Sequence, residues 1–248
     1  MKISATVIVK NEEKNISDCL NSLDFADEII VVDSGSSDRT GAICRSHPKV
    51  RFYERAWEGF GRQKDIAADL AVNDWIFNID ADERVSPILK SSIMSAPFEK
   101  YDGFRVAREN YFGSRWIRRC GWYPDYNLRL YDRNKCRYGE RAVHEAVSCQ
   151  GLVSTLSGNL LHFTYEGTGD YLRRMERYST LAAEQMITDG RRPGFVSLLV
   201  RPIFTFFKMY VMKGGVLEGH DGFILSSLYA CYTFCKYAKA IEMVRKGH

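Results

Sequence analysis

The chain has 248 residues, of which 45% are hydrophobic and 27% charged, an ordinary composition for a globular protein. This composition excludes a disordered or fibrous chain, and the length suits one domain with an appended segment. The formal net charge of +4 favours weak attraction to phosphates or anionic lipids. It is too small to indicate nucleic-acid binding by itself.

The cysteines and the N-terminus indicate the compartment. The seven cysteines are odd in number and lack the paired spacing of a metal site, so we expect free thiols in a reducing cytoplasm. Cys231 and Cys235 lie four residues apart in an apolar run and are expected to pack within a helix. No basic segment or cleavage site accompanies the first apolar run, which predicts that the protein is not exported.

In the first half of the chain, apolar runs alternate with helical patterns. The predicted strands are 3–9, 28–33, 50–53 and 75–80, and the predicted helices are 15–23 and 62–71. Continuous apolar strands separated by helices predict an α/β fold, with a mostly parallel sheet flanked by helices on both faces.

Polar residues follow three of these strands, at 10–12, 33–36 and 80–83. In open α/β sheets, ligands bind at the carboxyl ends of the strands. The sequence therefore predicts a crevice rich in carboxylates at this edge.

The second half of the chain has two patterns. Short strand-like pieces with Gly, Pro and arginine run from 103 to 162, and we expect them to complete the domain and to shape an acceptor site. Predicted helices follow at 171–188, 195–212 and 222–244. The predicted domains are thus a catalytic domain at 1–165 and a helical C-terminal segment at 166–248.

Asp80 and Asp82 lie two positions apart at the end of an extended run, so their carboxylates can point to one face. Such a pair suits Mg²⁺ or Mn²⁺, which complete their shell with water and substrate phosphates. Alternatively the acids cap the helix that begins near Ser86, although Ser86 and Pro87 already supply a start signal. Asp33 has two readings as well: it can accept from a nucleoside, or it can serve only the turn that follows it.

Three motifs in register resemble glycosyltransferase family 2. They are residues 6–12 (Thr-Val-Ile-Val-Lys-Asn-Glu), 30–40 (from Ile-Val-Val-Asp-Ser-Gly to Asp-Arg-Thr) and 80–83 (Asp-Ala-Asp-Glu). Residues 57–65 and the run into Asp74 and Trp75 resemble the bacterial lipopolysaccharide-core β-glucosyltransferases within that family. The resemblance covers 3–90 and, more loosely, 127–178.

The resemblance implies the GT-A fold and an inverting transfer from a nucleotide sugar, usually UDP-linked, with a divalent cation. It implies that the nucleotide sugar is bound by Asn11, Glu12, Asp33, Lys64 and Asp80, and that Asp80 and Asp82 form the metal and diphosphate motif. Asp65 departs from the pattern of the lipopolysaccharide-core subgroup, where an asparagine is expected.

An inverting transfer needs a group that takes the proton of the acceptor hydroxyl. Glu145 is the first candidate and Asp125 the second, and His144 is expected close to the donor sugar or metal. Glu145 can instead be a solvated charge on a strand, and His144 a packing residue. His162, at the end of an apolar run, matches by its place in the chain the late histidine that GT-A enzymes often bring to the metal, so the resemblance implies a third metal ligand; a buried, hydrogen-bonded histidine is the alternative.

Nine arginines lie between Arg105 and Arg141, interleaved with aromatic residues. Arg115, Arg118, Arg119 and Trp122 are the expected acceptor contacts, because guanidinium groups recognise phosphorylated or carboxylated saccharides. A nucleic acid or a plain charged surface would also fit the pattern. The acidic crevice argues against nucleic acid.

The two apolar C-terminal helices are interrupted by Arg201, Pro202 and Lys208 and, near the end, by Lys236 and Lys239. Neither helix is therefore predicted to be an uninterrupted transmembrane helix. We expect both helices to lie on the cytoplasmic face of the inner membrane. Packing on the catalytic domain or on a second subunit, as in a homo-oligomer, is the alternative.

The resemblance to the lipopolysaccharide-core subgroup implies a metal-assisted inverting transfer of a hexose, glucose from UDP-glucose, to a heptose of the lipopolysaccharide core. One rival is the same chemistry on a carrier-lipid-linked saccharide, a capsule unit or a peptide. The other is a membrane-associated protein that binds nucleotide sugars without turnover.

Overall fold

The computed structural model describes residues 1–138 and 147–247, and the chain divides into two compact units. Unit 1 contains 1–108 and 125–162, and unit 2 contains 109–124 and 163–248. The division falls within two long strands, β6 (Gly103–Phe112) and β11 (Val153–Tyr165). The sequence alone did not predict that 109–124 group with the C-terminal helices.

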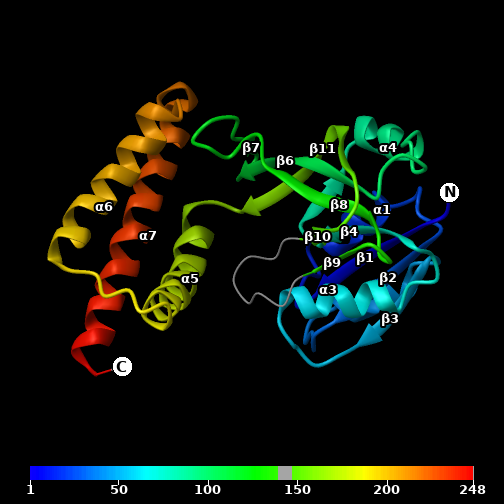
Figure 1. The fold of residues 1–248 in the computed structure, drawn as a ribbon, viewed down its shortest axis with the longest axis horizontal. Helices are drawn as coiled ribbons and strands as arrows, with labels where there is room; N and C mark the ends of the chain where they lie inside the picture. The colour runs from blue at the N-terminus through cyan, green and yellow to red at the C-terminus, as the bar shows by residue number, and fades with distance from the viewer. Residues whose placement is uncertain (139–146, 248) are drawn as a thin grey trace. The chain divides into compact units, whose positions relative to one another are not determined.

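Within the described residues, the main sheet has nine strands. Its first four, in the order β3-β2-β1-β4, are parallel: β1 (Ile3–Val9), β2 (Glu28–Asp33), β3 (Val50–Glu54) and β4 (Trp75–Asp80). It continues through β8 (Tyr126–Asp132), β6, β11 and β5 (Glu83–Val85), and β7 (Arg115–Trp116) pairs with β6. The β4–β8, β8–β6 and β11–β5 pairs are antiparallel. The sheet is therefore mixed, with its parallel half first in the chain (Figure 1).

Apolar side chains on both faces of β2 explain why helices cover the sheet on two sides. Successive residues of a strand point to opposite faces: Ile29 and Val31 pack in one core cluster, and Ile30 and Val32 in another. The first cluster includes residues of α1 (Ile16–Asn21), α2 (Thr40–Ser46) and α4 (Pro87–Met94). The second includes residues of α3 (Phe60–Asp69).

Helix α4 starts as its sequence predicts. The Ser86 hydroxyl accepts a hydrogen bond from the backbone N–H of Leu89 at 3.3 Å, and Pro87 occupies the first turn. Leu89 and Ile93 are fully buried under the sheet, and burial of such side chains contributes about 1.5–3 kcal/mol each. The cap is thus made by Ser86, and neither Asp80 nor Asp82 is needed for it.

Unit 2 is mainly helical. Its elements are α5 (Thr168–Thr188), α6 (Phe195–Phe207), the π-helical η1 (Lys208–Met212), the 3₁₀ turn η2 (Gly215–Glu218) and α7 (Gly219–Arg245). One core cluster contains Trp122, Tyr171, Leu225 and Leu228. The residues from 109 to 124 therefore share a core with the helices, which explains their grouping.

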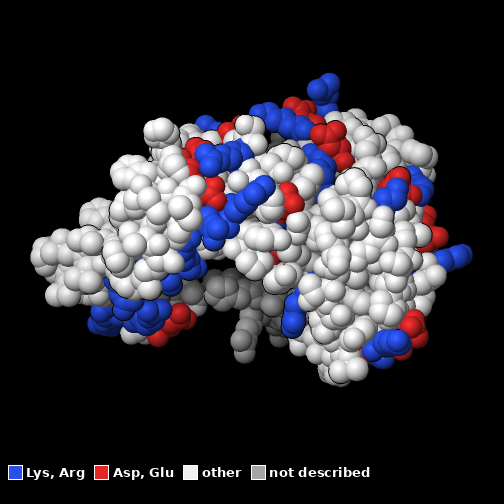
Figure 2. Space-filling model, turned by 90° about the horizontal axis from the view of Figure 1, so that it is seen from above, with Lys and Arg blue, Asp and Glu red and all other residues white. Residues whose placement is uncertain are grey.

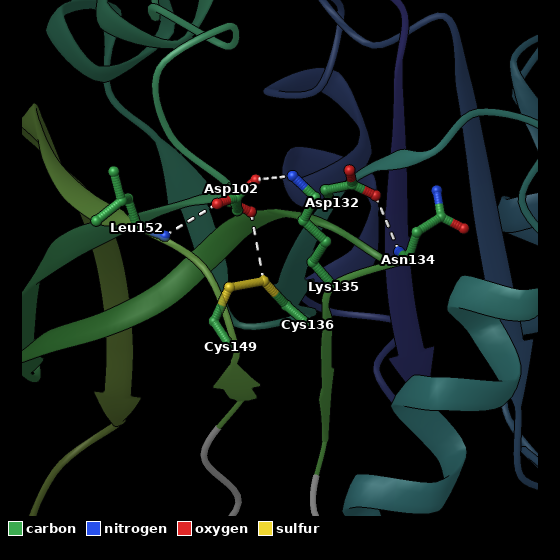
Figure 3. The surroundings of a disulfide bond; sticks show 7 residues. All are labelled: Asp102, Asp132, Asn134, Lys135, Cys136, Cys149 and Leu152. Atoms are coloured by element: carbon green, nitrogen blue, oxygen red, sulfur yellow. Dashed lines mark hydrogen bonds and ion pairs between the residues drawn. A yellow bond between two sulfur atoms is a disulfide. The ribbon is translucent and has the colours of Figure 1, made fainter.

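One disulfide corrects the prediction that all the cysteines are free. Cys136 and Cys149 are joined across the hairpin of β9 (Cys136–Tyr138) and β10 (Val147–Cys149), where they are paired in register (Figure 3). The other five cysteines are free, and Cys19, Cys44 and Cys120 are buried. Sequence separation gives no sign of this pairing, because it arises from the register of a short hairpin.

Candidate active site at the carboxyl ends of the strands

The ends of β1 and β2 are locked together through Asn11. Its backbone N–H donates to the Ser36 hydroxyl at 2.9 Å, and its Oδ1 accepts from the N–H of Ser37 at 2.8 Å. Asn11 has a φ of 57°, a region that asparagine tolerates better than most residues. Asp33 is buried and accepts from the N–H and the hydroxyl of Ser36. The strand ends therefore form one rigid turn.

Glu12 lies in the turn between β1 and α1. Its N–H donates to the Thr40 hydroxyl at 2.8 Å, and its carboxylate accepts from the side chain of Asn15 at 2.9 Å. Its carbonyl accepts from the N–H groups of Asn15 and Ile16. These contacts place Glu12 beside Asn11 at the same edge of the sheet.

Asp80 is held between two buried cations. Lys64 Nζ lies 2.9 Å from Asp80 Oδ1, and Arg129 Nη2 lies 2.9 Å from Asp80 Oδ2. Removal from water opposes ionisation of Asp80, but the charges of Lys64 and Arg129 outweigh it, and its pKa lies well below the ordinary value. Both oxygens of Asp80 are therefore already engaged by protein cations.

Glu83 is a further member of the charged cluster around Asp80. The side chain is completely buried, 2.6 Å from Arg129 Nη2 and 3.6 Å from Arg108 Nη1. Its Oε2 also accepts from the N–H of Asp80 at 3.0 Å. Burial raises the pKa of Glu83, against the opposing charge of Arg129. The carboxylate thus fixes both the backbone and the guanidinium partner of Asp80.

A polar network lies under these charges. Asn78 Oδ1 accepts from the Tyr138 hydroxyl at 2.8 Å and from Arg129 at 3.3 Å, and its amide donates to the Thr6 hydroxyl at 3.0 Å. Lys64 Nζ lies 5.5 Å from the centre of the Tyr138 ring. Tyr138 also donates its backbone N–H to Asp65 at 3.1 Å, so the unexpected aspartate holds β9 against α3.

Asp82, the second acid of the Asp-Ala-Asp motif, contacts His162. His162 is opposite Glu83 in the antiparallel β11–β5 pair, which brings His162 Nε2 to 3.5 Å from Asp82 Oδ2. Both side chains are mostly buried. A carboxylate oxygen and an imidazole nitrogen at this separation fit two positions of one divalent cation, whose other ligands would be water and diphosphate. The described residues contain no group of three or more His, Cys, Asp or Glu placed to hold a metal.

The two proposed bases differ in what the structure shows of them. Asp125 Oδ2 is paired with Arg108 Nη2 at 2.6 Å, and its Oδ1 accepts from Asn127 at 3.1 Å. Both oxygens of Asp125 are thus engaged. Glu145 and His144 lie outside the described residues.

The four residues predicted to bind the acceptor all lie in unit 2. Arg115 pairs with Glu218 at 3.2 Å and with Asp221 at 3.0 Å. The Arg118 guanidinium lies 4.4 Å from the Trp116 ring centre, and Trp122 is buried in the aromatic core of this unit. Arg119 accepts from the N–H of Trp122 through its carbonyl at 3.0 Å. These contacts hold the unit together, and acceptor binding stays a prediction.

Three residues of this site were not predicted from the sequence: Arg129, Glu83 and Asn78. Arginine in an alternating strand is normally read as a solvent-facing charge, and Arg129 is 4% exposed. A signal was nevertheless present: Asn78 interrupts the buried run 75–80, and a buried amide requires partners. Two of these partners, Arg129 and Tyr138, come from β8 and β9, far along the chain, where spacing cannot reveal them.

Comparisons with known proteins agree on the family. The family model for glycosyl transferase family 2 matches residues 4–153. A lipopolysaccharide core biosynthesis glycosyltransferase of Rhizobium meliloti, LpsC, is 35% identical over 255 residues, covering 98% of this chain and 93% of that protein. An uncharacterized glycosyltransferase of Rickettsia bellii is 30% identical over 258 residues, covering 98% and 87%.

Solved structures show the same fold. Staphylococcus aureus TarS 1-349 in complex with UDP-GlcNAc has a TM-score of 0.54 at 18% identity, covering 100% of this chain and 93% of that one. The mannosyltransferase PcManGT of Pyrobaculum calidifontis, in complex with GDP-Man and Mn²⁺, has a TM-score of 0.56 at 14% identity, covering 97% and 87%.

Proposed function

The chain belongs to glycosyltransferase family 2 and has the GT-A fold, and we propose that it transfers glucose from UDP-glucose, with inversion, to a heptose of the lipopolysaccharide core. The observation that carries the proposal is the gathering of Asp33, Lys64, Asp80 and Asp82 at the carboxyl edge of the parallel strands. The similarity to LpsC supports the lipopolysaccharide acceptor.

In this proposal the donor nucleotide lies along the ends of β1 and β2. Asp33 is held in place by Ser36, so its position is set before a nucleoside arrives. Lys64 lies in the middle of α3 with its ammonium group fixed by Asp80, and a cation at this position attracts a diphosphate. Gln63, the residue before Lys64, has a buried Oε1 that has no hydrogen-bond partner among the described residues.

Asp82 and His162 would hold the divalent cation. When bound, the cation neutralises the negative charge that develops on the diphosphate leaving group. Asp80 has a different role in the proposal, because Lys64 and Arg129 occupy its oxygens. It orients Lys64 toward the diphosphate and is itself oriented by Arg129 and Glu83.

Glu145 is the proposed base, and its assignment rests on the sequence. The engagement of both Asp125 oxygens by Arg108 and Asn127 favours Glu145 over Asp125, since a base needs an oxygen that can reach the acceptor hydroxyl. His144 is proposed to lie beside the donor sugar.

The deciding experiment incubates the full chain with Mn²⁺, a set of UDP-sugars and lipopolysaccharide core acceptors truncated at successive sugars, with products read by mass. The expected result is addition of one hexose from UDP-glucose to a heptose-terminated acceptor. Transfer only to a carrier-lipid saccharide or a peptide would overturn the acceptor. Binding of UDP-sugar with no release of UDP under any condition would overturn the enzyme assignment.

A further inference from the structure

Helix α6 and the adjoining η1 carry an exposed apolar surface. The stretch Phe195–Met212 is, by length and composition, apolar enough to cross a membrane, yet only 6% of it is buried within the described structure. Its outward side chains include Phe195, Val196, Val200, Ile203, Phe204 and Phe207, all at least half exposed. An apolar patch of this extent on a protein surface marks a contact site.

The spacing of these residues places them on one side of the helix. Val196, Val200, Ile203 and Phe207 recur at intervals of three and four, the periodicity of a single helical face. We call this the α6 apolar face, defined by these four residues together with Phe204.

A different side of the same segment packs on α7. Thr205 bonds to Thr233 at 3.3 Å, the Phe206 ring lies 5.6 Å from Phe223, and Met209 is buried. The α6 apolar face thus remains exposed, because the contacts of the helix within unit 2 use its other side.

Basic side chains border this face, and acidic ones are absent from the segment. Residues 191–213 contain Arg191, Arg192, Arg201, Lys208 and Lys213 and no Asp or Glu. On the side where α6 and α7 lie, Figure 2 shows a broad uncharged surface and, at its edge, a group of basic side chains with acidic ones next to it. This pairing of apolar and cationic surface matches the acyl and phosphate layers of an anionic bilayer.

Two of these arginines act on a lysine of α7. Burial lowers the pKa of Lys236 on α7, and the nearby charges of Arg191 and Arg201 lower it further. Like charges near one another disfavour each other, and a bound anion offsets that repulsion. The positive charges of Arg191, Arg201 and Lys236 therefore add to the attraction of this unit for anions.

The segment is poorly suited to crossing a bilayer. Arg201 and Lys208 fall within the apolar stretch, and Pro202 lies inside α6, whose regular α-helical part ends at Phe207. Two cations at membrane depth are expensive, whereas at the interface both reach the headgroups. The composition therefore favours a helix that lies in the plane of the membrane.

We propose that the α6 apolar face inserts into the headgroup region of an anionic lipid bilayer, with Arg191, Arg201 and Lys208 bound to lipid phosphates. This contact would hold the protein peripherally on the cytoplasmic face of the inner membrane. The proposal rests on unit 2 alone and stands whether or not glucose is the sugar transferred.

The experiment is co-sedimentation of the full chain with vesicles of phosphatidylglycerol and phosphatidylethanolamine in equal parts, compared with phosphatidylcholine vesicles. We expect binding to the anionic vesicles that weakens in about 1 M NaCl, where charges are screened beyond about 3 Å. The double substitution Ile203→Ser and Phe207→Ser should reduce the affinity at least about 10-fold. Arg201→Glu should reduce it as well.

Matched controls come from equally exposed positions of unit 1. Val72→Ser with Ile88→Ser removes two exposed apolar side chains and should leave vesicle binding unchanged, as should Lys100→Glu. Circular dichroism checks that each variant is folded.

Three results would overturn the proposal. The first is a lack of specific binding: either the wild-type protein stays in the supernatant with anionic vesicles, or the folded Ile203→Ser, Phe207→Ser variant binds as tightly as the wild type. The second is resistance of the bound protein to alkaline carbonate extraction, which would indicate a membrane span. The third is a dimer in solution that these substitutions dissociate without changing vesicle binding, because a second copy would then cover the face.

Discussion

His162 Nε2 lies 3.5 Å from Asp82 Oδ2, although His162 belongs to β11 and Asp82 to the turn between β4 and β5, far apart in the sequence. The antiparallel pairing of β11 with β5 creates this contact. It leaves Asp82 and His162 as the metal ligands of the proposed site, while Asp80 is committed to Lys64 and Arg129.

Asp82→Asn should therefore weaken Mn²⁺ binding more than Asp80→Asn does. We expect a loss of at least about 10-fold in metal affinity for Asp82→Asn, since even residues that only orient a ligand cost that much. His162→Ala should behave in the same way. Calorimetric titration of Mn²⁺ in the presence of UDP measures both.

Asp74→Asn is the control for this titration, because Asp74 belongs to an exposed ion pair with Arg133. It should bind Mn²⁺ as wild type does. Equal losses for Asp80→Asn and Asp82→Asn would contradict the division of roles between the two acids.

Arg129→Met should destabilise the protein strongly. The substitution leaves Glu83 buried and deprives it of its nearest cation, and breaking a buried pair in this way costs about 3–5 kcal/mol. Urea unfolding followed by circular dichroism measures the change. Arg137→Met removes one partner of an exposed pair with Asp69 and should cost about 0–1 kcal/mol; similar values for the two variants would refute the structural role of Arg129.

Asp80 makes a specific contribution to acid stability. Its pKa is lower in the folded protein than the ordinary value, so its charged form stabilises the fold above the unfolded-state pKa of about 3.9. This stabilisation disappears as the pH falls through the lowered folded-state pKa. The difference in unfolding free energy between wild type and Asp80→Asn should accordingly be largest at neutral pH and shrink below about pH 4. A difference that is constant between pH 7 and pH 3 would be inconsistent with this linkage.

The structure predicts how many cysteines can be alkylated with and without reduction, and mass spectrometry measures that number. Alkylation of the unfolded, unreduced protein should modify the five free cysteines, and prior reduction should add Cys136 and Cys149. In the folded protein Cys44 should not react at neutral pH, because burial raises the pKa of its thiol to about 12. Cys231 is exposed and should react first. Seven modifications without reduction would show that the disulfide is absent from the purified protein.

The sequence predicted the framework of the site better than its contacts. The strands at 3–9, 28–33 and 75–80 have the bounds that their apolar runs predicted, because period and burial are local properties. Arg129 and Glu83 could not be assigned, since each is explained only by the other and by Asp80. The same limit applies to the residues from 109 to 124, which join the helical unit through contacts with residues about a hundred positions later.

The charges around Asp80 have a thermodynamic consequence. The cluster combines four carboxylates (Asp80, Asp82, Glu83 and Asp125) with three cations (Lys64, Arg108 and Arg129), so it carries one more negative than positive formal charge. A diphosphate approaching it without a metal therefore meets net repulsion. In the proposed reaction, cation and donor therefore bind with positive coupling, and by reciprocity each raises the affinity of the other by the same factor. UDP-sugar affinity should then depend steeply on Mn²⁺ concentration, so that metal supply sets how much donor the protein retains.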